Sequence, residues 1–262
     1  IKYDDKLILG SPTSDTTIAA LLSSRIGFEL NLPEDFLNNV INLPRDTTYV
    51  ADCLDKIRNA IVLDGADKLK HMTRYLDEIE LLYQEGLAVV DVGYSGTIQK
   101  AFQKIINRGV TGYYMSTTTA IADVKKTPGG KAFAYFNDNH PSRHCAVDVL
   151  SPLLESFMTA PCGQVINYKP VKSGNSERVE PVYKQEGIAQ RNFEYISKIH
   201  KGIESYLLDM IHIYGPDVMK KSYPAEQSLA VLNAVMNNKI IFSSDFLEKL
   251  YMEDDFCASG EV

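Results

Sequence analysis

One short stretch constrains the fold more than any other part of the chain. The apolar run Leu87–Val90 ends in Asp91 and leads through a glycine-containing turn into an amphipathic segment. This order is typical of a buried parallel strand that delivers a loop onto the N-terminus of a helix. Such a loop offers backbone N–H groups, hydroxyls and the positive end of a helix dipole. We therefore expect any phosphate or nucleotide ligand of this chain to bind here.

The residues that follow complete the pattern of an α/β unit. Thr97–Asn107 has apolar residues at helical spacing, and Val110–Tyr114 is a second apolar run. We expect Leu87–Val90 and Val110–Tyr114 to be adjacent parallel strands that the helix connects. Ligands of open α/β sheets bind beyond the carboxyl ends of the strands. The Asp91 loop and the Ser116–Thr119 segment would both lie at that edge.

The sequence on either side of this unit is predicted to be mostly helical. Apolar residues recur at helical spacing before Gly86, with a break at Asp64-Gly65, and again after Glu186. Lys172–Arg178 is predicted to be a flexible loop. The expected fold class is therefore α/β, with a Rossmann-like parallel sheet and large helical additions at both ends. The expected portions, within one compact fragment of a longer protein, are a helical part at 1–86, an α/β core at 87–185 and a helical part at 186–262.

Charge and composition exclude several classes of protein. The 262 residues carry a formal net charge of -7, whereas a general nucleic-acid binder needs a basic face. No apolar run approaches the ~20 residues that cross a bilayer, and Ile1 begins no signal-peptide pattern. The 4 cysteines are far apart in the sequence, which favours free thiols in a reducing cytoplasm. We expect a cytoplasmic protein with no membrane span, no nucleic-acid partner and no tightly held metal.

Several segments taken together resemble one known family. They are Arg74–Leu76 followed by Val89–Gln99, then Gly112–Met115, then Leu153–Glu155 with Ala160–Gly163 and Tyr168, and finally a helix from about Asn192 to Ile203. Together they resemble the C-terminal region of large bacterial proteins of the haloacid dehalogenase (HAD) superfamily of predicted hydrolases, which are associated with surface-polysaccharide biosynthesis. The most specific piece is the string Asp-Val-Gly-Tyr-Ser-Gly-Thr-Ile-Gln at Asp91–Gln99.

The departure from the HAD pattern changes what this resemblance implies. HAD hydrolases use a nucleophilic Asp in an Asp-x-Asp-x-Thr/Val loop, and the second Asp acts as the acid/base. Gly93 stands where that second Asp belongs. The resemblance therefore implies an accessory domain that would lie downstream of a HAD domain, rather than the hydrolase itself.

The candidate ligand-binding residues are Asp91, Gly93, Tyr94, Ser95, Gly96, Thr97, Gln99, Arg143 and Glu155. Asp91 either binds a sugar hydroxyl, a ribose hydroxyl or a metal, or accepts N–H bonds from the following turn. The two glycines permit unusual backbone angles, which the close approach of a phosphate would also require. The hydroxyls of Ser95 and Thr97 suit an oxyanion and a helix cap equally well. The Gln99 side chain either points at a ligand or is solvated.

The only cluster of histidines is His140 and His144, with Asp138, Arg143 and Cys145 around them. Pro141 disfavours a helix through the pair, so a polar loop over the sheet edge is expected, from which Arg143 either clamps an anion or contacts solvent. Glu155 follows two leucines, and a buried Glu requires a partner. The sequence defines no Ser/His/Asp or Cys/His nucleophile arrangement and identifies no cofactor.

These observations lead to two hypotheses about function. The first is a domain that binds a phosphorylated sugar or a nucleotide sugar at Asp91–Gln99, with a transferase-like activity as one outcome. The alternative is a non-catalytic scaffold or regulatory domain that accompanies a HAD or glycosyltransferase domain.

Overall fold

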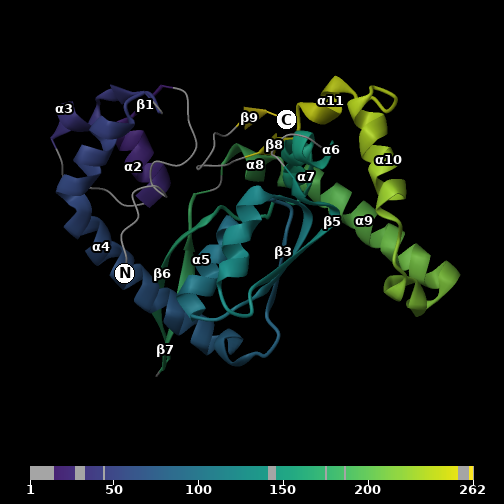
Figure 1. Cartoon of the computed structure of the whole chain (residues 1–262), viewed down its shortest axis with the longest axis horizontal. Coiled ribbons are helices and arrows are strands. Elements are labelled where there is room, and N and C mark those ends of the chain that lie inside the picture. The colour runs from purple at the N-terminus through teal and green to yellow at the C-terminus, as the bar shows by residue number, and fades with distance from the viewer. Residues whose placement is uncertain are drawn as a thin grey trace. The chain divides into compact units, whose positions relative to one another are not determined.

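The computed structural model describes residues 15–26, 33–43, 45–140, 146–174, 176–185, 187–252 and 260–261. Within these ranges the chain forms two compact units, and Figure 1 labels many of their helices and strands. Among the described residues, none of the helices combines the length and the apolar character that a membrane span requires.

The first unit is built on one long helix, α4. The start of α4 buries Val50, Cys53 and Leu54 against Ile18 and Leu21 of α2, which makes a small apolar core. An antiparallel hairpin, β6–β7, belongs to the same unit. The elements of this unit are β1 (Thr16–Thr17), α2 (Ile18–Ile26), α3 (Glu34–Leu37), β2 (Val40–Ile41), α4 (Thr47–Glu78), β6 (Val165–Ser173) and β7 (Ser176–Tyr183).

Two sequence predictions are wrong in this unit. The helix α4 continues through Asp64-Gly65 without a break, because one glycine costs only about 1 kcal/mol relative to alanine in a helix. Lys172–Arg178 was expected to be a flexible loop, but its described residues on either side of 175 belong to the β6–β7 hairpin, with Gly174 at φ 62°.

The hairpin and α4 are joined by ion pairs. Arg74 contacts the carboxylate of Glu177 at 2.7 Å and that of Glu78 at 2.8 Å. The Glu78 carboxylate also accepts the backbone N–H of Val179 at 2.7 Å. The hairpin therefore groups with α4, whereas the sequence had placed it in the α/β core at 87–185.

The second unit contains the predicted parallel sheet. The strands β3 (Ala88–Asp91), β4 (Thr111–Thr118) and β5 (Lys131–His140) lie in the order β3-β4-β5, and each neighbouring pair is parallel. The helix α5 (Thr97–Ile106) connects β3 to β4. The predicted strand–helix–strand unit and the Rossmann-like α/β class are thus confirmed.

Helices make up most of the remaining chain. The α7 and α9 helices share an apolar core of Leu153, Ile196 and Leu250, with several phenylalanines packed around it. The remaining elements of the chain are η1 (Leu81–Tyr83), η2 (Thr119–Lys126), α6 (Ala146–Val149), α7 (Ser151–Phe157), α8 (Ile188–Arg191), α9 (Phe193–Tyr214), η3 (Pro216–Lys220), α10 (Ala225–Met236), α11 (Ser244–Leu247), β8 (Tyr251–Met252) and β9 (Gly260–Glu261).

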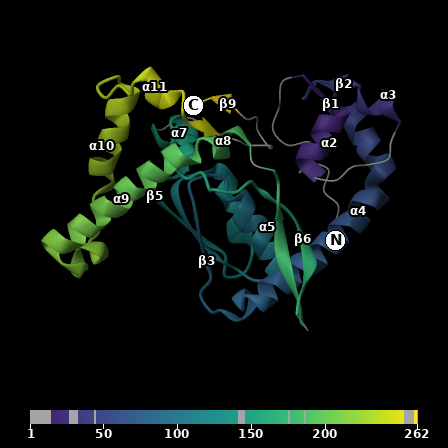
Figure 2. The same ribbon diagram turned by 180° about the vertical axis from the view of Figure 1, so that it is seen from behind.

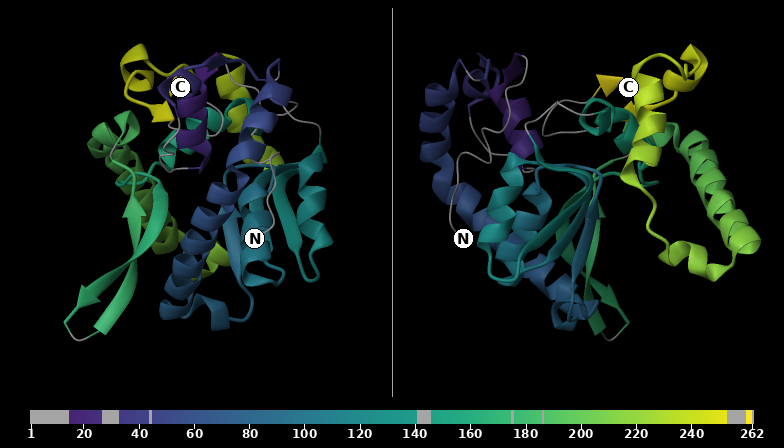
Figure 3. Two further views of the ribbon diagram at one scale, coloured as in Figure 1. Left: turned by 90° about the vertical axis from the view of Figure 1, so that its left-hand side faces the viewer. Right: turned by 45° about the vertical axis from the view of Figure 1, so that its right-hand side comes forward.

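The two faces of the parallel sheet differ. The right-hand view of Figure 3 shows α5 along one side of the strands, and on this side Tyr114 packs with Ile121 and Val124 of η2. The register aligns Val90, Tyr113 and Phe133 on the other side, where they are 87%, 50% and 52% exposed. Parallel sheets are normally covered on both faces, so this apolar face is unusual.

Asp123 of η2 forms two ion pairs, one of which links η2 to α5, and these pairs make the stability of the fold depend on pH. Its carboxylate contacts Lys100 at 2.5 Å and Lys126 at 2.6 Å. The hydrogen bond from Lys100, and then that from Lys126, lowers the pKa of Asp123 from 3.8 to about 2. Because the folded-state pKa is lowered, the unfolded chain binds more protons between these two values, and stability rises with pH across this window.

We therefore expect the contribution of Asp123 to stability to be complete above about pH 4 and to be lost as the pH falls toward about 2. Urea unfolding of the full chain at a series of pH values measures this loss, and Asp123→Asn should flatten the profile between these pH values. Asp217, which pairs with Lys220 on the surface, provides the control variant Asp217→Asn. An acid profile of Asp123→Asn that matches wild type would contradict the prediction.

Candidate functional site

The loop between β3 and α5 begins with a turn that Asp91 holds together. Its Oδ1 atom accepts the backbone N–H of Gly93 at 2.8 Å. This is the turn-stabilising role that the sequence offered as one of two interpretations. The same bond explains Gly93, because a Cβ at this position would lie 3.0 Å from that Asp91 oxygen.

Position 96 requires a glycine for two reasons, its backbone conformation and the close packing of the core around it. It adopts the left-handed conformation, with φ 71°, immediately before α5. A Cβ here would lie 2.6 Å from Ile121 Cδ1 and 2.7 Å from Val124 Cγ2. The missing side chain therefore makes room for η2.

The N-terminus of α5 has free hydrogen-bond donors. No side chain caps it, and the first amide with a carbonyl acceptor is that of Lys100, which donates to Gly96 O at 2.9 Å. Among the described residues, the amides of Thr97, Ile98 and Gln99 have no acceptor. The hydroxyls of Ser95 and Thr97 lie 3.0 Å apart and contact each other instead of capping the helix.

Gln99 serves the fold and is not accessible to a ligand. Its side chain is 0% exposed. The Nε2 atom donates to Val110 O at 2.6 Å and to Lys131 O at 2.9 Å, while Oε1 accepts from Tyr114 Oη at 2.7 Å. Burial is the main reason that the pKa of Tyr114 lies well above its usual value, which keeps this hydroxyl protonated as a donor. Both sequence interpretations of Gln99, a ligand contact and a solvated side chain, are wrong.

A second group of polar residues lies at the ends of β4 and β5. Thr117 Oγ1 donates to Asp138 Oδ1 at 2.5 Å and accepts the N–H of Asn139 at 3.0 Å. Thr118 N donates to Tyr94 O at 2.9 Å, which ties this group to the β3–α5 loop. Both sets of residues therefore share the carboxyl edge of the sheet, where ligands of α/β folds bind.

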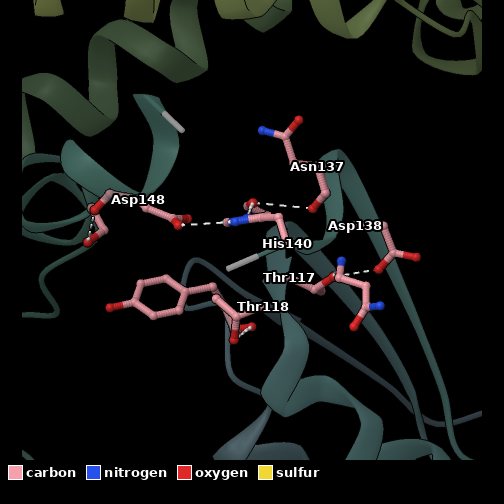
Figure 4. A network of polar contacts seen from close by, with 10 residues as sticks. Thr117, Thr118, Asn137, Asp138, His140 and Asp148 are labelled. Atoms are coloured by element: carbon pink, nitrogen blue, oxygen red, sulfur yellow. Dashed lines mark hydrogen bonds and ion pairs between the residues drawn. The ribbon is translucent and has the colours of Figure 1, made fainter. Parts of the chain in front are cut away.

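His140 is the centre of this group. Figure 4 shows its ring between Asp148 and the strand-end residues Asn137 and Asp138. Its Nε2 atom lies 2.6 Å from Ser116 Oγ, and its Nδ1 atom lies 3.6 Å from Asp148 Oδ2. Asp138 and His140 were expected in a polar loop over the sheet edge, but the structure shows that both belong to the end of β5.

The other candidates lie elsewhere or outside the described residues. Glu155 is half-buried on α7, a helix that contacts α9 and β8. Arg143, His144 and Cys145 lie outside the described residues. Within the part of the chain that the structure describes, no group of three or more His, Cys, Asp or Glu side chains could hold a metal ion.

Sequence reasoning missed the roles of Ser116 and Asp148. It placed Ser116–Thr119 at the carboxyl edge but assigned no chemistry to the segment. Asp148 is an acid within the apolar stretch Ala146–Leu150, and its side chain is 2% exposed in the structure. A charged residue within an apolar run is the signal that could have identified it, because buried acids require a partner.

No protein-family model matches this chain, and neither a curated protein nor a solved structure is similar enough to count as a match. The function of the site is therefore argued from its geometry.

The contacts of Gln99 predict a loss of stability when its amide is removed. Gln99→Leu would leave the carbonyls of Val110 and Lys131 buried without this donor, which costs about 1–3 kcal/mol. Urea unfolding should show a lower midpoint with an unchanged slope. Gln84 is exposed, so the control Gln84→Leu should change stability by no more than about 0.5 kcal/mol. Equal midpoints for the two variants would show that the bonds of Gln99 contribute nothing.

Proposed function

We propose that the second unit binds a phosphorylated sugar or a nucleotide sugar at the β3–α5 loop. The observation that carries this proposal is the uncapped N-terminus of α5, where the amides of the exposed residues Thr97 and Ile98 have no acceptor among the described residues. Aligned N–H groups and the positive end of the helix dipole attract a phosphate. The ligand would satisfy donors that the fold leaves open.

The surroundings of the loop support the same ligand class. The Ser95 and Thr97 hydroxyls stand beside the free amides and can donate to phosphate oxygens. The carboxyl edge of an open α/β sheet is the usual place for such ligands. Asp91 acts indirectly in this proposal, because its bond to Gly93 fixes the turn that leads to α5.

The cellular setting proposed for this domain comes from the family resemblance in its sequence. We infer a cytoplasmic accessory domain in surface-polysaccharide biosynthesis, working with a HAD or glycosyltransferase domain. A transferase-like activity on the bound sugar is part of this proposal. HAD chemistry at Asp91 is not part of it, because Gly93 replaces the acid/base residue.

A charge at the start of α5 tests the proposal. Thr97 is exposed, and Thr97→Glu would place a carboxylate beside the free amides, where it repels a phosphate and interacts favourably with the helix dipole. We expect wild type to bind inorganic phosphate and UDP-glucose in calorimetric titrations. Loss of a charge-assisted hydrogen bond, worth about 1.5–3 kcal/mol, should weaken binding by Thr97→Glu tenfold or more without lowering the melting temperature.

The matched control is Ala101→Glu, an exposed position further along the same helix that receives the same charge. It should bind both ligands nearly as wild type does. Undiminished binding by folded Thr97→Glu would show that the ligand lies elsewhere, and absence of binding by wild type would end the proposal.

The scaffold alternative is favoured by a different observation. The C-terminal half of α9 carries exposed apolar side chains, including Ile203, Tyr206, Leu208 and Tyr214. Figure 2 shows this half of the helix running away from α7 and α8. An apolar helix face of this kind suits contact with another protein, and it becomes the leading explanation if the α5 loop binds no anion.

A further inference from the structure

A serine, a histidine and an aspartate lie in series at the carboxyl end of β4. Ser116 Oγ is 2.6 Å from His140 Nε2, and His140 Nδ1 is 3.6 Å from Asp148 Oδ2. This is the order of nucleophile, general base and orienting acid in serine-dependent acyl transfer. We propose that these three residues, the serine relay, cleave carboxylic esters that have an apolar acyl group.

The buried carboxylate determines which nitrogen of His140 carries the proton. A lone pair on Nδ1 would face the negative charge of Asp148, so the proton belongs on Nδ1. Nε2 then presents its lone pair to Ser116, whose hydroxyl can donate either to it or to Asn137 O at 3.2 Å. The shorter contact is to the imidazole, which is the geometry that activates a serine.

The backbone is distorted at the point where it brings His140 to Ser116. The register between β4 and β5 shifts twice, between Tyr114 and Ser116 and again between Ser116 and Thr118. Asn139, next to His140, has a positive φ of 56°. Bulges are rare in parallel pairs and frequent beside active sites, where they re-aim side chains. Strained backbone of this kind also gathers at functional sites.

Burial determines how a substrate reaches the relay. Ser116 is 0% exposed, while the side chains of His140 and Asp148 are 14% and 2% exposed. His140 is the most exposed of the three side chains, so an ester carbonyl would approach the relay beside it. The contact between His140 and Asp148 is longer than a hydrogen bond, and catalytic contacts are often long in the absence of substrate.

The class of ester is argued from a cavity beside α6 whose lining side chains are apolar except for that of Asn238. Its volume is about 390 Å³, and its lining includes Val149, Leu150, Leu153 and Ile241. Val149 directly follows Asp148 in α6, so this short helix contributes to the relay and to the cavity. A cavity of this size accommodates an aliphatic acyl chain.

The reaction requires no reactant other than the ester and water. Ser116 Oγ bonds to the carbonyl carbon as its proton passes to His140 Nε2, and the ester C–O bond breaks as the departing alcohol takes that proton. Water then attacks the acyl-serine, with its proton passing through Nε2 to Ser116 Oγ. The products are the carboxylic acid and the alcohol. This inference does not rest on phosphate binding at α5.

The test uses the full chain with p-nitrophenyl acetate and p-nitrophenyl hexanoate, and a fluorophosphonate probe followed by peptide mass spectrometry. We expect hydrolysis that favours the hexanoate, and one adduct on Ser116. Ser116→Ala should abolish both signals. His140→Gln should slow turnover by about 10²–10⁴-fold, the usual contribution of a general base. Asp148→Asn, at the positioning residue, should lower kcat and leave KM unchanged.

Ser156→Ala is the matched control, because Ser156 is equally buried and its hydroxyl also bonds to a backbone carbonyl. It should retain turnover and labelling. Circular dichroism checks that each variant is folded, and if Ser116→Ala does not fold, Ser116→Cys replaces it and should be alkylated by iodoacetamide at the new thiol. Absence of a Ser116 adduct in wild type, or undiminished hydrolysis by folded Ser116→Ala, would overturn the proposal. An unchanged preference for the hexanoate in Ile241→Glu would overturn the role of the cavity.

Discussion

The contacts of a single amide side chain organise the α/β part of this protein. Gln99 on α5 donates to backbone carbonyls just before β4 and at the start of β5, and accepts from Tyr114 in the middle of the sheet. Helix–sheet interfaces are usually apolar, and a polar side chain is tolerated in one only when all its groups are satisfied. Because Gln99 meets that condition, it fixes where α5 begins, and with it the direction in which the free amides point.

The two candidate sites follow from this arrangement in different ways. The β3–α5 loop is shaped by local requirements, namely the Asp91 turn and the space that Gly96 leaves for η2. The serine relay depends on contacts between distant parts of the chain, because β4, β5 and α6 each supply one member. The bond between Thr118 and Tyr94 joins the two regions, so that the β3–α5 loop and the serine relay lie at the same edge of the sheet.

Local patterns were sufficient to predict the strand–helix–strand unit, since apolar runs, a turn and helical spacing are encoded in neighbouring residues. They were not sufficient for Gln99, because its burial depends on the absence of a side chain at Gly112, whose Cβ would lie 2.2 Å from Gln99 Oε1. They also could not place Ser116 beside His140, because that contact requires two register shifts within β5. The helix break predicted at Asp64-Gly65 was wrong because a local signal was given too much weight. The packing of a long helix outweighs one unfavourable residue.

The open face of the sheet has a consequence for how the loop behaves over time. In the sheet as described, β3 pairs on one side only, spans four residues and leaves Val90 87% exposed. A short edge strand with so little buried surface opens more readily than the central strand, and its amide protons exchange faster. The strand that leads into the loop before α5 is therefore the least stable of the three strands of the sheet. A molecule bound at the free amides of α5 would slow exchange in β3, and part of its binding energy would be spent on keeping that strand closed.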